Sequence, residues 1–103
     1  MKNEVNKAQT VSLETRVELQ EPQLYQVYLH NDDFTPMEFV AGVLERFFYM
    51  GRQKATEVML EAHMKGKALC GIYTKDLAET LVSEIIDYAR IHEYPLVCST
   101  DAA

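Results

Sequence analysis

Residues 24–40 have the sequence LYQVYLHNDDFTPMEFV and predict a strand, a turn and the start of a helix. Apolar and polar residues alternate over residues 24–30, which places Tyr25, Val27 and Leu29 on one face, as in a half-buried strand. The three polar residues at 31–33 are typical of a turn. The chain is therefore expected to leave a sheet, reverse direction and enter a helix within about ten residues.

The start of this first helix has the expected signals. Thr35 is predicted to cap it, Pro36 suits the first helical position, and Glu38 completes a capping box. Apolar residues then recur at helical spacing as far as residue 48, and Gly51 is expected to provide the left-handed exit.

The remaining chain predicts four more elements. These are a helix over about residues 52–64, a strand over 67–73, a helix that begins after Thr74, and a last short strand over 94–99. The order β-α-α-β-α-β predicts an α+β fold, with a three-stranded antiparallel sheet packed on three helices. We expect one compact core domain over residues 23–103.

Residues 1–22 differ from this core, since they are mostly polar and charged. Such a segment is expected to form a flexible N-terminal extension, in which a short helix over Leu13–Leu19 would be only marginally stable.

Composition excludes several classes of function. The 103-residue chain has a net charge of -6, which disfavours nucleic-acid binding because acidic surfaces repel phosphates. It has neither an apolar run of membrane-spanning length nor the pattern of a secretion signal, so a cytoplasmic protein is expected. The two cysteines, Cys70 and Cys98, form no CxxC motif and are expected to be buried thiols.

The densest polar cluster is Asn31-Asp32-Asp33, and His63 is the second candidate for a functional residue. Amide and carboxylate oxygens suit a cation, either a metal ion or a primary ammonium. The same residue types are common in turns that bond only to their own backbone, and a lone histidine is more often structural than a ligand. The residues alone leave these alternatives open.

The sequence resembles the ClpS family, the bacterial adaptors of the ClpA unfoldase and the ClpP peptidase. The resemblance covers about residues 24–99 and is carried by five stretches, which are Leu29–Val40 (LHNDDFTPMEFV), Met59–His63 (MLEAH), Gly66–Gly71 (GKALCG), Ala78–Thr80 (AET) and Pro95–Cys98 (PLVC). It implies an adaptor of the N-end rule, which binds proteins whose first residue is Leu, Phe, Tyr or Trp and delivers them to ClpA. No catalysis and no cofactor are implied.

The resemblance also implies roles for individual residues. Asn31, Asp33 and His63 would hold the α-ammonium group of the substrate, with Asp32 close by. An apolar pocket would take the first side chain, with Met37 as a gatekeeper against β-branched residues and with the other walls formed by Thr35, Val40, Met59, Ala62 and Leu96.

Two features depart from the familiar family pattern. Ala62 stands where a valine is familiar, which implies a roomier pocket. Leu81 stands where a lysine of the unfoldase-docking face is familiar, and Asp76 replaces a glutamate nearby. The surface that docks on the N-terminal domain of ClpA therefore departs further from the familiar pattern than the substrate site does.

Two other functions are weighed against the adaptor. A small metal-dependent hydrolase using Asp32, Asp33 and His63 would hold a stoichiometric divalent ion. A ligand-free protein interaction module, similar in fold to the C-terminal domain of a ribosomal stalk protein, would have no peptide pocket.

Overall fold

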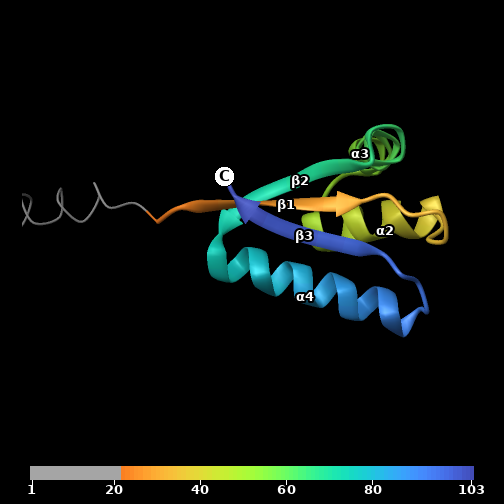
Figure 1. Cartoon of the computed structure of the whole chain (residues 1–103). Coiled ribbons are helices and arrows are strands. Elements are labelled where there is room, and N and C mark those ends of the chain that lie inside the picture. Colours follow the sequence, from red (N-terminus) through yellow and green to blue (C-terminus); the bar gives the residue numbers. More distant parts are fainter. Residues whose placement is uncertain (1–21) are drawn as a thin grey trace, which may run out of the picture.

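The computed structural model describes residues 22–103 (Figure 1). The predicted order β-α-α-β-α-β is confirmed, and the elements are β1 (Leu24–His30), α2 (Met37–Phe48), α3 (Arg52–Lys65), β2 (Lys67–Thr74), α4 (Lys75–Ile91) and β3 (Val97–Ala102). The helix considered over Leu13–Leu19 lies outside the described residues. None of the helices in residues 22–103 combines the length and the apolar composition needed to cross a bilayer.

The three strands form an antiparallel sheet with β1 at its centre, in the order β2-β1-β3. His30, the last residue of β1, pairs with Lys67 at the start of β2 and with Val97 at the start of β3. At the other end, Leu24 pairs with Thr74, where α4 begins. The loop after β1 therefore emerges beside the end of α3, and α4 begins at the opposite end of the sheet.

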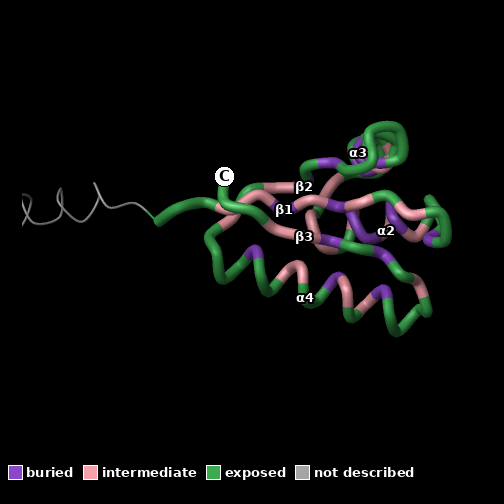
Figure 2. The backbone as a smooth tube through the Cα atoms, viewed as in Figure 1, coloured by how far each residue is buried: buried purple, intermediate pink, exposed green. Residues whose placement is uncertain are grey.

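The helices pack on one face of this sheet. Val27 and Leu29 of β1 are fully buried, whereas the alternate residues Gln26, Tyr28 and His30 are only half-buried. In Figure 1 the strands lie in front of α2, with α3 and α4 to either side, and Figure 2 shows the buried positions along the same backbone. The apolar residues that alternate along β1 therefore point to the face of the sheet that the helices cover, and the residues between them point to the open face.

Each helix contributes an apolar stripe to a single core. Val43 and Leu44 of α2, Ala55 of α3 and Ile85 of α4 are completely shielded from solvent. Burying a side chain of the size of valine, leucine or isoleucine stabilises a fold by about 1.5–3 kcal/mol. This core fixes the positions of α2 and α3 against β1, and the candidate site lies among these elements.

The predicted helix ends need correction in two places. Helix α2 begins at Met37 with Pro36 as its cap residue, and the Thr35 hydroxyl makes no capping hydrogen bond. The left-handed exit from α2 is Tyr49 (φ 54°), whereas Gly51 has an extended conformation and precedes α3. Tyr49, which is 89% exposed, therefore occupies the left-handed position that glycine usually takes.

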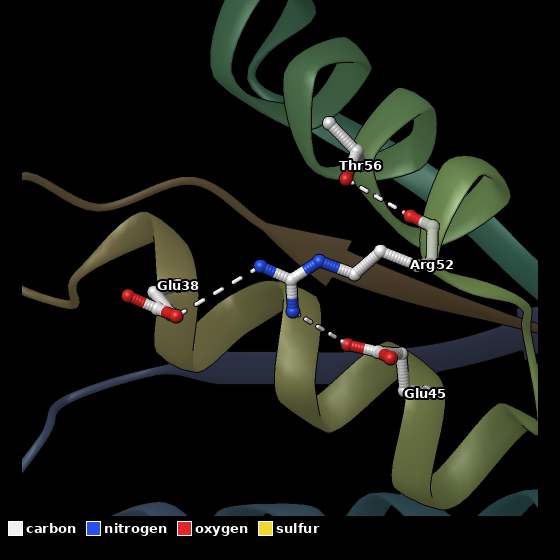
Figure 3. A network of polar contacts seen from close by, with 4 residues as sticks. All are labelled: Glu38, Glu45, Arg52 and Thr56. Carbon is white, nitrogen blue, oxygen red and sulfur yellow. Dashed lines mark hydrogen bonds and ion pairs between the residues drawn. The ribbon is translucent and has the colours of Figure 1, made fainter.

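Helices α2 and α3 are also joined by an ion-pair network (Figure 3). The Arg52 guanidinium lies 3.1 Å from a carboxylate oxygen of Glu45 and 3.8 Å from one of Glu38. Glu38 therefore pairs across to α3 and does not close a capping box with Thr35. Exposed ion pairs are each worth only about 0.2–1 kcal/mol, so this network supports the helix pair that the core already places.

Candidate functional site

A cavity of about 210 Å³ opens at the end of β1, between α2 and α3. Drug-sized ligands usually occupy cavities of about 300–1,000 Å³, so this volume suits a single amino-acid side chain. Its lining combines polar and apolar residues, namely Leu29, His30, Asn31, Asp32, Asp33, Thr35, Met37, Val40, Met59, Ala62 and His63.

The loop after β1 is held at two points. The Asn31 backbone N–H donates to the Gly66 carbonyl at 2.9 Å, which ties the loop to the end of α3. The Asp32 carboxylate accepts two backbone hydrogen bonds through Oδ1, from Phe34 at 2.8 Å and from Thr35 at 2.7 Å. These contacts hold residues 31–35 as a tight turn beside the last turn of α3.

The turn and α3 together build a polar rim on the cavity. Asn31 and Asp33 are exposed on the turn, and His63 is exposed on the last turn of α3. Among the described residues these three side chains have no hydrogen-bond or ion-pair partner, so their acceptor atoms are free. The rim offers acceptors to a cationic group that brings several donors.

The charge on the cavity wall is negative. Asp32 and Asp33 supply two carboxylates, and neither lysine nor arginine lies among the lining residues. Within residues 22–103, no cluster of three or more histidine, cysteine, aspartate or glutamate side chains is arranged to hold a metal ion. The negative charge of the wall suits a cationic group.

The deeper wall of the cavity is apolar. Leu29 of β1, Val40 of α2 and Ala62 of α3 are 1%, 8% and 2% exposed, and they belong to the hydrophobic core. Met59 packs against this core, while Met37 at the start of α2 is 46% exposed. The cavity thus has a charged rim and an apolar interior, which suits a ligand with a cationic end beside an apolar group.

Two polar atoms inside the turn have no partner. Asp32 Oδ2 and Thr35 Oγ1 are both buried and unpaired among the described residues. Thr35 as a whole is only 8% exposed. Buried acceptors without a donor are uncommon because each costs free energy, and such groups often mark functional positions.

The structure brings nine of the ten predicted substrate-site residues around one cavity. The exception is Leu96, which is 3% exposed in the core and lines a different cavity, beside Pro95 and Val97. Leu29 and His30 also line the site but were not predicted. Their position at the end of the strand that leads into the polar turn is a signal that could have identified them.

The two predicted docking residues lie on α4, away from this cavity. Asp76 is in the first turn of α4, which begins directly after Thr74. Thr74 pairs with Leu24, and Leu24 is at the opposite end of β1 from His30 and the cavity. Leu81 lines a second cavity of about 410 Å³, together with Tyr49 and Leu77. A strand as long as β1 spans roughly 20 Å, so the substrate site and the start of α4 are well separated.

The cysteines take no part in either site. Cys70 and Cys98 are both buried and unpaired. Burial raises the pKa of each thiol to about 12, and for Cys70 the neighbouring Cys98 adds to the increase. Thiols in this state are poor nucleophiles.

Comparisons with known proteins identify the family of this chain. Residues 20–99 match the family described as ATP-dependent Clp protease adaptor protein ClpS. The ClpS adapter protein of Hyphomonas neptunium is 53% identical over 88 residues, which are 85% of this chain and 75% of that protein. The corresponding protein of Caulobacter vibrioides (strain NA1000 / CB15N) is 49% identical over 92 residues, covering 89% of this chain and 84% of that protein.

A solved structure shows the same fold. It is Agrobacterium tumefaciens ClpS2 bound to L-phenylalaninamide, which superposes with a TM-score of 0.79 at 38% sequence identity. The match covers 81% of this chain and 100% of that one. The family match spans almost all of the described residues, including the motif of the polar turn. The chain therefore belongs to the ClpS family of ATP-dependent Clp protease adaptors.

Proposed function

We propose that this protein binds proteins whose first residue is Leu, Phe, Tyr or Trp and delivers them to the ClpA unfoldase of the ClpAP protease in the cytoplasm. The observation that carries the proposal is the cavity itself, because it joins a rim of free acceptors to an apolar interior. An N-terminal residue has the matching shape, with an α-ammonium one bond away from the carbon that bears its side chain. Binding requires no bond to be made or broken, so the protein acts as an adaptor and not as an enzyme.

The α-ammonium group binds at the rim. Its three donors are taken by Asn31, Asp33 and His63, while the negative charge of Asp32 lies close by. Hydrogen bonds that involve a charged group are about twice as strong as neutral ones, so this contact contributes much of the affinity. His63 acts as an acceptor through the ring nitrogen that carries no proton.

The first side chain enters the cavity. Val40, Met59 and Ala62 contact its apolar surface, Thr35 lies in the wall, and Met37 at the mouth excludes side chains branched at Cβ. Exclusion by shape gives selectivity that apolar attraction alone does not supply. The Agrobacterium ClpS2 structure supports this assignment, because L-phenylalaninamide combines a free α-amine with an apolar side chain.

The unfoldase binds elsewhere on the surface. Asp76 and Leu81 on α4 contact the N-terminal domain of ClpA, and the separation of α4's first turn from the cavity allows substrate and unfoldase to bind at once. Leu81 contributes an apolar contact, since it lines a cavity beside Leu77.

Fluorescence anisotropy with two labelled peptides tests the substrate site. The peptides share one sequence that begins with Leu, and only one has an acetylated N-terminus. Micromolar or tighter binding of the free amine alone is expected. Equal binding of both peptides, or no binding, would exclude the amine site and favour an interaction module without a pocket. A stoichiometric divalent ion in purified protein would instead favour a hydrolase.

A further inference from the structure

The two adjacent carboxylates of the turn have different surroundings. Asp33 is exposed and has no partner among the described residues, whereas Asp32 is half-buried and directs its carboxylate into the turn. Asp32 Oδ1 already accepts two backbone N–H groups, from Phe34 and Thr35. The two aspartates are adjacent in the sequence, so their positions alone do not show this difference in surroundings.

The second oxygen of Asp32 is closed to a ligand. Oδ2 is buried and has no hydrogen-bond partner in the described part of the chain. An ammonium group at the rim could reach this oxygen only if the turn opened, which would break the hydrogen bonds at 2.7 and 2.8 Å that Oδ1 accepts. Direct contact with a ligand is therefore left to its neighbours, Asn31 and Asp33.

The Oδ1 contacts have a consequence for those neighbours. Asp33 lies between Asp32 and the two N–H groups that Asp32 accepts, so its backbone is fixed by the ring that these bonds close. Asn31, on the other side, is fixed by its own N–H bond to the Gly66 carbonyl. The rim is thus preorganised by one backbone contact and one side-chain contact, and preorganised acceptors bind more tightly than mobile ones.

We propose that Asp32 is a positioning residue of the amine site. Its carboxylate oxygen Oδ1 holds the turn that presents Asn31 and Asp33, and the residue acts through its acceptor geometry and not through contact with the ammonium. The inference rests on the proposed function, and it gives a specific task to Asp32, which the resemblance places only close to the ammonium group.

Substitution by asparagine separates geometry from charge. Asp32→Asn keeps an Oδ1 acceptor for both N–H groups, removes the negative charge, and replaces the buried, unpaired Oδ2 with an amide nitrogen. Asp32→Ala removes the acceptor as well. Asp33→Asn is the matched control, because it makes the same chemical change one residue later, on a carboxylate that is free.

The full chain and its three variants are titrated with the labelled peptide that begins with a free Leu. We expect Asp32→Asn to bind within about threefold of the unsubstituted protein. Asp33→Asn is expected to bind at least about tenfold more weakly, because it loses a charge-assisted contact with the ammonium. Asp32→Ala is expected to lose about as much, because the turn loses both hydrogen bonds that Oδ1 accepts. A loss in Asp32→Asn as large as that in Asp33→Asn would overturn the proposal, because the charge would then be what matters. Unchanged binding by Asp32→Ala would overturn it too.

A second measurement needs no ligand. Amide hydrogen exchange at Phe34 and Thr35 is expected to be as slow in Asp32→Asn as in the unsubstituted protein, and faster in Asp32→Ala. Faster exchange in Asp32→Asn would show that the amide cannot hold the turn, and the positioning role would be rejected. Failure of the unsubstituted protein to bind any free-amine peptide would instead refute the proposed function, so the two failures are distinguishable.

Discussion

Two glycine-to-alanine substitutions are expected to shift stability in opposite directions. Gly66 ends α3 with φ 93° and ψ -26°, a conformation that residues with a Cβ rarely adopt. Gly42 lies inside α2, where alanine is preferred. A Cβ at either position would meet no atom of a more distant part of the described chain within 4 Å, so packing contributes little to either change. The backbone conformation alone therefore decides whether each substitution raises or lowers the free energy of unfolding.

The magnitudes follow from that difference. Gly66→Ala is expected to cost roughly 1–2 kcal/mol of unfolding free energy, the usual penalty of a left-handed conformation. Gly42→Ala is expected to add about 0.5–1 kcal/mol. For a domain of this size each kcal/mol corresponds to about 4–8 °C in Tm, so the two variants should melt on opposite sides of the unsubstituted protein.

Thermal unfolding followed by circular dichroism measures both shifts, and peptide titration adds a functional test. Because the Gly66 carbonyl accepts the Asn31 N–H, strain at Gly66 is expected to weaken binding of a free-amine peptide, whereas Gly42→Ala should leave it unchanged. Equal Tm shifts of the same sign in the two variants would refute the conformational argument. A stabilised Gly66→Ala variant would do so as well.

Three other predictions concern the pocket, the histidine and the thiols. Met37→Ala is expected to admit peptides that begin with Ile or Val. Fluorescence anisotropy should then show a smaller ratio of the affinity for a Leu peptide to the affinity for an Ile peptide. An unchanged ratio would show that Met37 does not exclude β-branched side chains. His63→Ala is expected to weaken binding of the free-amine peptide, because it removes the ring nitrogen that accepts from the ammonium at the rim; unchanged affinity would remove His63 from the amine site. Burial raises the pKa of Cys70 and Cys98 from 9.0 to about 12. Well below pH 9 both thiols are protonated in the folded and in the unfolded state, so they do not make the free energy of unfolding depend on pH. Between pH 9 and about 12 the unfolded state loses these protons first and stability should fall, as denaturant titrations across this range would show. A thiol reagent at pH 8 should label neither cysteine until the protein unfolds.

Much of the site follows from local sequence. The alternation over residues 24–30 places the polar turn at a strand end, and helical spacing places Met37 and Val40 on one element and Met59, Ala62 and His63 on the next. These are short-range patterns, and each depends only on the period of one strand or helix. The element order could therefore be predicted from these patterns. The substrate-site residues were implied by the resemblance to the ClpS family, and nine of those ten residues line one cavity.

The errors arise where distant segments meet. The resemblance implies that Leu96 lines the substrate cavity, whereas the structure places it in the core just before β3, where it lines another cavity. Thr35 has the sequence of a helix cap, but Asp32 accepts its N–H and its hydroxyl is left unpaired. Local propensity is a weak guide wherever a side chain finds a better partner in the folded chain.

The sequence by itself determined the order of the elements, the face of each that is apolar, and the family to which the chain belongs. Only the tertiary structure decided which polar atoms remain free for a ligand. Asn31 and His63 are 32 positions apart, and they meet because the Asn31 N–H bonds to the carbonyl at the end of α3. Asp32 and Asp33 are adjacent and have the same side chain, yet the turn buries one carboxylate oxygen of Asp32 and leaves Asp33 exposed. Pairing and burial depend on contacts between segments, and for that reason periodicity within one segment could not predict them.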